Sequence, residues 1–70
     1  MINQNTIGIN AGKIWRRLDE GELTNPEVNV IREECGLSSE DFLLALGWLS
    51  RENKIRFMIG KKKIYVFPAD

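Results

Sequence analysis

One stretch of the sequence decides the fold: LSSEDFLLALGWLSRENKI, residues 37–55. Phe42, Leu46 and Leu49 follow one another at the spacing that places side chains on one face of a helix. Ser38 precedes this pattern and suits an N-cap, because its hydroxyl can accept a hydrogen bond from a free N–H group of the first turn. Asn53 follows the pattern and tolerates the left-handed conformation in which many helices end. The stretch therefore predicts a helix with one buried face.

The opposite face of this helix is also apolar. Leu44 and Trp48 lie one turn apart on the far side from Phe42 and share that side with Glu40 and Arg51. An exposed leucine–tryptophan pair bordered by charges is typical of a protein interface. Alternatively, the C-terminal part of the same chain, such as Tyr65, covers the indole. The candidates for a protein interface are Leu43, Leu44, Gly47, Trp48 and Arg51.

Two further helices are predicted upstream. Ile7, Ala11, Ile14 and Leu18 form one face of a first helix, which we expect to begin at a cap on Asn5 or Thr6 and to end at Gly21. Residues 22–24 then form a short link, which we assign as an extra strand.

The second helix is expected to begin with Asn25 as its N-cap and Pro26 at its first position. Its inward stripe is Val28, Ile31 and Cys35. Gly36 is placed to take the left-handed conformation just past its end.

The C-terminal part of the chain predicts a β-hairpin. Residues 55–59 and 63–67 are rich in β-branched and aromatic side chains, and residues 60–62 between them are short enough for a turn. Pro68 is expected to stop the last strand. The element order is helix, short strand, helix, helix, hairpin, which predicts an α+β fold in one domain, residues 1–70.

This order, with Gly36, Leu37 and Ser38 in the turn and residues 45–55 (ALGWLSRENKI) leading into the hairpin, resembles the winged helix-turn-helix superfamily. More narrowly, it is similar to a family of small uncharacterised bacterial winged-helix proteins. The resemblance implies a fold of three helices and a two-stranded wing, and it implies DNA binding as the superfamily's usual role. Two features depart from the pattern. Arg32 stands where a small residue is common, and the outward face of the third helix is apolar and acidic rather than basic.

Composition narrows the range of functions. The formal net charge is zero, whereas DNA-binding domains usually carry a basic excess that displaces counterions from phosphate. Cys35 is the only cysteine and the chain has no histidine, so the sequence holds no intrachain disulfide and no cysteine–histidine zinc site. We find no catalytic constellation and expect neither an enzyme nor a cofactor. Without a signal peptide or an apolar run of membrane-spanning length, we expect a cytoplasmic protein.

The basic side chains concentrate near the C-terminus, where residues 51–70 carry six of the ten. A basic hairpin can contact the phosphate backbone of a nucleic acid. Alternatively, its lysines only keep the turn soluble and protect strand edges. We expect a protein partner or a second copy of the chain, with nucleic acid possible through the hairpin, and neither a membrane nor a small-molecule substrate. The nucleic-acid candidates are Ser39, Arg56, Lys61, Lys62 and Lys63.

Overall fold

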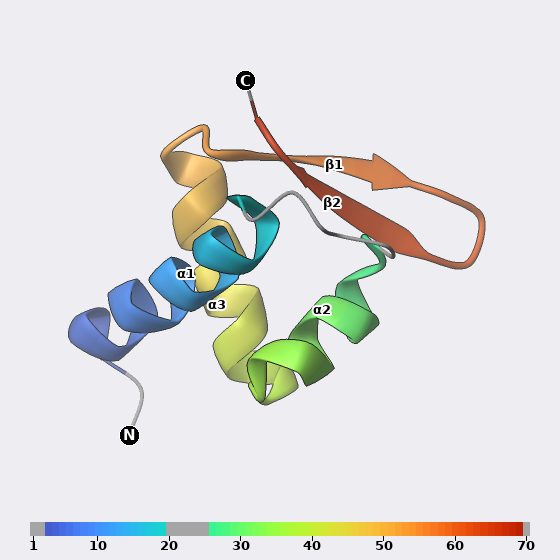
Figure 1. Ribbon diagram of the computed structural model, residues 1–70. Coiled ribbons are helices and arrows are strands. Elements are labelled where there is room, and N and C mark those ends of the chain that lie inside the picture. Colours follow the sequence, from blue (N-terminus) through green and yellow to red (C-terminus); the bar gives the residue numbers. More distant parts are fainter. Residues whose placement is uncertain (1–2, 20–25, 70) are drawn as a thin grey trace.

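The computed structural model describes residues 3–19 and 26–69. Three helices are followed by one antiparallel hairpin, which confirms the predicted order of these elements (Figure 1). The strands pair from Ile55 opposite Pro68 to Ile59 opposite Ile64. The elements are α1 (Gln4–Asp19), α2 (Val28–Cys35), α3 (Ser39–Arg51), β1 (Ile55–Ile59) and β2 (Ile64–Pro68).

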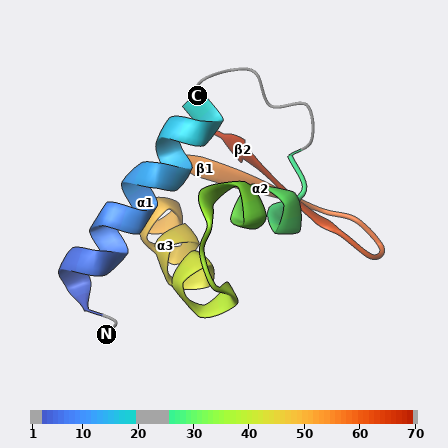
Figure 2. The same cartoon turned by 60° about the horizontal axis from the view of Figure 1, so that its bottom comes forward.

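The core lies between α1, α3, α2 and the base of the hairpin. The contact of α1 with α3 is the most extensive between any two helices (Figure 2). The predicted stripes of all three helices face this core, apart from Ile7 at the start of α1, which is partly buried and lies outside the core cluster. Val28 and Cys35 of α2 pack against the core and are also only partly buried. The buried apolar side chains are Ala11, Ile14, Leu18, Ile31, Leu37, Phe42, Ala45, Leu46, Leu49, Ile55 and Val66.

The predicted ends of α3 are confirmed. The Ser38 hydroxyl accepts a hydrogen bond from the backbone N–H of Asp41 at 3.2 Å. Asn53 has a φ of 58° and turns the chain from α3 into β1, and Gly36 has a φ of 69° at the end of α2. These local signals fix the length of α3 and its connections at both ends.

The predicted starts of the first two helices are wrong. The Asn3 side chain accepts from the N–H of Thr6 at 2.8 Å, so α1 already begins at Gln4. Helix α2 begins at Val28, with the carboxylate of Glu27 as the cap that accepts from the N–H of Asn29. Pro26 lies outside the helix.

Long-range pairing explains the late start of α2. The carbonyl of Pro26 accepts from the N–H of Val66 at 3.0 Å, and Glu27 forms an isolated bridge with Tyr65. This pairing holds the backbone extended up to Glu27, so the helix cannot start earlier. The predicted strand at residues 22–24, the Asn25 cap and the Gly21 stop lie outside the described residues.

The last strand includes Pro68, which we expected to lie just beyond it. The N–H of Ala69 donates to the carbonyl of Lys54 at 2.8 Å, so this pair is hydrogen-bonded across the hairpin. Bonding alternates along an antiparallel ladder, so the nitrogen of Pro68 points away from β1. Its missing N–H therefore costs no ladder bond.

Two glycine substitutions should change stability in opposite directions. Gly36→Ala places a side chain at a positive φ and should lower the free energy of unfolding by about 1 kcal/mol. Gly47 lies within α3 with open space around its Cα, so Gly47→Ala should raise the free energy of unfolding by up to ~1 kcal/mol. Urea denaturation of the two variants checks this. Equal destabilisation by both would contradict the assigned backbone conformations.

Candidate interaction surface

Helix α3 leaves two apolar flanks outside the core. Leu44 and Trp48 lie on the flank next to α1, where the indole Cζ2 is 3.7 Å from the position that a Cβ on Gly8 would occupy. Even so, Leu44 remains 41% exposed and Trp48 40% exposed. Helix α1 therefore covers the indole only in part, and the apolar pair predicted from the sequence stays open to a partner.

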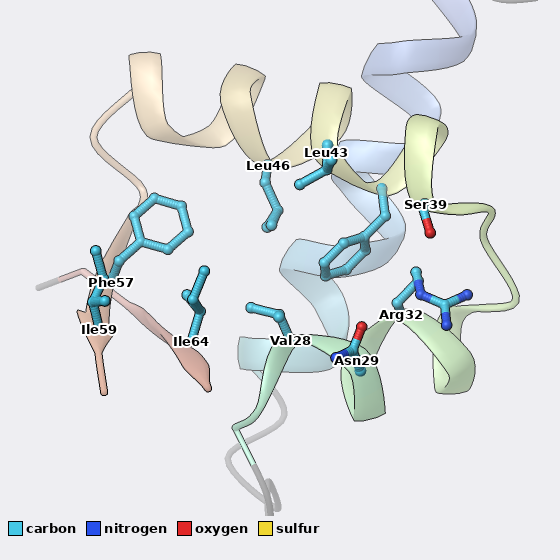
Figure 3. Close-up of a pocket in the computed structure, with 10 residues that line it drawn as sticks. Val28, Asn29, Arg32, Ser39, Leu43, Leu46, Phe57, Ile59 and Ile64 are labelled. Carbon is cyan, nitrogen blue, oxygen red and sulfur yellow. The ribbon is translucent and has the colours of Figure 1, made fainter. Parts of the chain in front are cut away.

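Leu43 lies on the other flank and is 65% exposed. It forms part of the wall of an apolar groove of about 300 Å³ between α2, α3 and the hairpin. Figure 3 shows Phe57, Ile59 and Ile64 on the hairpin side of this groove and Leu43 and Leu46 on the α3 side. The polar residues Asn29, Arg32 and Ser39 lie at its other end, between α2 and α3.

We did not predict from the sequence that the hairpin side of this groove would be part of the exposed apolar surface. Among the described residues, the large hydrophobic side chains that remain exposed lie on α3 and the hairpin, apart from Ile9 on α1. The available signal was the uninterrupted apolar run of residues 57–59, because a half-buried strand normally alternates apolar with polar side chains. The exposed members on α3 and on the face of the hairpin that turns toward it are Leu43, Leu44, Trp48, Phe57, Ile59 and Ile64, and we call them the apolar surface. Met58 lies on the opposite face of β1, with Arg56 and Phe67.

The remaining interface candidates lie at the outer edge of α3. Gly47 is exposed, and a Cβ built on it would meet no atom within 4 Å. A close approach by another backbone at Gly47 would therefore have to come from outside the described part of the chain. Arg51 is exposed in the last turn of the helix.

The nucleic-acid candidates do not form one patch around α3. Ser39 lines the polar end of the groove, whereas Lys61, Lys62 and Lys63 are exposed in the turn between the strands. Arg56 is exposed on β1. The hairpin projects beyond the helices, so its turn is the most outlying basic part of the described chain (Figure 1).

Arg32, which stands where the superfamily commonly has a small residue, has a structural role. Its guanidinium Nη1 donates to the carbonyl of Leu37 at 3.1 Å and so braces the turn between α2 and α3. Its Nη2 lies 4.0 Å from a carboxylate oxygen of Glu33. The Nε is buried, and among the described residues it meets no hydrogen-bond partner.

A polar pocket of about 270 Å³ lies on the opposite side of α2, against α1. Arg17 and Glu34 form an ion pair across it at 2.7 Å, and Cys35, Lys13 and Arg16 complete its lining. Burial raises the pKa of the Cys35 thiol, an effect that Arg17 opposes and Glu34 reinforces. A thiol with a raised pKa is a poor nucleophile at neutral pH, which fits a packing role for Cys35.

The described residues contain no group of three or more cysteine, aspartate or glutamate side chains placed to hold a metal ion. None of their helices has both the length and the apolar character needed to cross a bilayer.

Comparison with known proteins identifies the family. A family model described as "Winged helix-turn-helix domain (DUF2582)" matches residues 1–68. The chain belongs to this winged helix-turn-helix family. Such domains often bind DNA or proteins and are typically non-enzymatic. Helix α3 corresponds in position to the helix that DNA-binding winged-helix proteins place in a DNA groove, and the hairpin corresponds to their wing.

Two other proteins are similar to this winged helix-turn-helix chain. An uncharacterised protein of Methanocaldococcus jannaschii is 39% identical over 57 residues, which is 81% of each chain. The solution NMR structure of a protein from Bacteroides thetaiotaomicron matches with a TM-score of 0.79 and 31% identity, over 96% of this chain and 79% of that one. One relative is archaeal and the other bacterial, so the comparison does not single out the bacterial source that the resemblance implied.

Burial should make Cys35 react more slowly than an unfolded thiol. Its raised pKa keeps less of it as thiolate at any given pH, so the midpoint of its alkylation rate against pH should lie higher in the folded chain than in urea. Stopped-flow measurement with a neutral alkylating reagent gives both midpoints. A folded midpoint equal to or below the unfolded one would contradict the assigned environment.

Proposed function

We propose that this winged-helix domain is a non-enzymatic interaction module that associates with a second copy of itself through α3 and the facing side of the wing. The observation that carries the proposal is the position of the apolar surface. Its residues lie on the two elements that winged-helix proteins use to meet a partner. Contiguous apolar patches on a small protein commonly mark sites of protein contact.

The small size of the chain favours a symmetric dimer in which both copies use the same patch. A typical specific interface buries about 800 Å² on each partner, and the described chain exposes 5030 Å² in all. A symmetric dimer needs only one self-complementary patch, which the apolar surface supplies. Burial of Leu44 and Trp48 alone would contribute roughly 2–5 kcal/mol, judged from their apolar area.

The charges on α3 also favour protein over DNA. Glu40 and Asp41 occupy its first turn, the end that a reading helix presents to base edges. Carboxylates at that position repel phosphate, whereas the helix dipole stabilises them. Arg51 is the basic side chain that α3 itself offers.

Exchange of exposed leucines for serine tests the proposal without disturbing the core. The double variant Leu43→Ser/Leu44→Ser should weaken self-association at least about tenfold, because each 1.4 kcal/mol of lost apolar burial is a factor of ten. Sedimentation equilibrium up to about 1 mM gives the dissociation constant. Ile9→Ser on α1 is the matched control, since it removes an exposed apolar side chain outside the surface. A wild-type chain that stays monomeric at the highest concentration would overturn the proposal.

DNA binding by the wing is a second candidate function, favoured by the exposed lysines of its turn. Contacts from lysine to phosphate would be insensitive to sequence and would weaken steeply with salt. Changing Lys61, Lys62 and Lys63 to alanine should then abolish binding of a random duplex at low salt, as measured by fluorescence anisotropy. Absence of binding by the wild-type chain at low salt would remove this candidate.

A further inference from the structure

Strand β1 has an outer edge whose backbone groups point away from β2. The N–H of Gly60 donates to the carbonyl of Lys63 at 2.8 Å, and that of Ala69 to Lys54 at 2.8 Å, so both pairs are bonded across the hairpin. Because bonded pairs alternate in an antiparallel ladder, Arg56 and Met58 direct their backbone groups toward β2. Phe57 and Ile59 direct theirs outward.

The other edge of the hairpin confirms this alternation. The N–H of Val66, which lies opposite Phe57, points outward from β2 and donates to the carbonyl of Pro26. The segment that leads into α2 thus occupies part of the β2 edge (Figure 1). The sheet of the described chain has two strands, so no further strand pairs with the β1 edge there.

This edge lacks the usual protections against strand pairing. Proteins commonly shield an edge with proline, a bulge or several charged side chains. Strand β1 contains no proline and a single charged residue, Arg56. Phe57 is 44% exposed and Ile59 is 77% exposed, so the side chains beside the outward backbone groups are accessible too.

The charges around this edge indicate which kind of strand can pair with it. Exposed cations flank β1 at both ends, with Lys54 before it and Lys61, Lys62 and Lys63 after it. Lys54 also lies 4.0 Å from a carboxylate oxygen of Glu52, so the excess of positive charge is at the turn. Antiparallel pairing of two β1 strands centred on Phe57 would bring the lysine turn of each copy beside Lys54 of the other. Like charges placed together disfavour such pairing, whereas acidic side chains on an added strand would be attracted.

We propose that the outer edge of β1 binds an extended peptide segment in which apolar residues alternate with aspartate or glutamate. The backbone of the segment pairs with Phe57 and Ile59, as in other cases of strand addition. Its apolar side chains extend the face formed by Phe57 and Ile59, and its carboxylates meet the lysines of the turn. This site goes beyond the proposed self-association, because it uses backbone groups and a partner of different chemistry.

The probe is a capped hexapeptide of alternating glutamate and valine, titrated into the ¹⁵N-labelled full chain. Binding should slow hydrogen exchange at the Phe57 and Ile59 amides, which face outward, and leave the Arg56 and Met58 amides unchanged because these already donate to β2. A peptide with lysine in place of glutamate, and one N-methylated at alternate residues, should both fail to bind. Equal binding of all three peptides, or none by the first, would overturn the proposal.

A proline variant tests the edge from the protein side. Ile59→Pro removes an outward N–H and leaves the bonds within the hairpin intact, so it should fold and lose at least about tenfold in peptide affinity. Ile59→Ala shortens the side chain but keeps the N–H, so it should lose less. Retained protection of the Arg56 and Met58 amides from hydrogen exchange would establish that the hairpin is intact. Full binding by a folded Ile59→Pro chain would contradict the site, whereas its sedimentation reports separately on self-association.

Discussion

The packing of α3 against α1 is the constraint on which the rest of the structure depends. Ala45 and Leu49 of α3 and Ala11 and Ile14 of α1 belong to one buried core with almost no exposed area. The hairpin and α2 then close the remaining open sides of that core. Among residues 3–19 and 26–69, no further helix or strand covers the outside of α3. The apolar character of α3 on more than one side therefore becomes a property of the molecular surface.

Local signals predicted α3 and its two ends, because a helix stripe, the Ser38 cap and the left-handed Asn53 depend only on neighbouring residues. The start of α2 was not predictable in the same way. It depends on a hydrogen bond between Pro26 and Val66, which are far apart in sequence. The exposed Leu44 and Trp48 pair was predicted from helical spacing. The groove was not, because Leu43 faces Ile59 and Ile64 only after the hairpin has folded toward α3.

The surface of this domain carries acidic, apolar and basic side chains in three separate places. The first turn of α3 is acidic, with Glu40 and Asp41. The outer flanks of α3 and the near side of the wing are apolar, and the wing tip is basic. Membership of the winged helix-turn-helix family fixes the scaffold, whereas the side chains on it determine what the scaffold meets. We propose that on this chain they favour contact with polypeptide at the centre and with anionic groups at the rim.

We propose above all that α3 and the near side of the wing contact a second copy of the chain. Isotope-filtered NOE spectroscopy on a mixture of labelled and unlabelled protein tests it most directly, because it detects only contacts between molecules. If the chain self-associates as proposed, we expect intermolecular NOEs from Leu43 and Leu44 to side chains of the partner copy. Their absence at about 1 mM, together with the relaxation rates of a monomer, would contradict it.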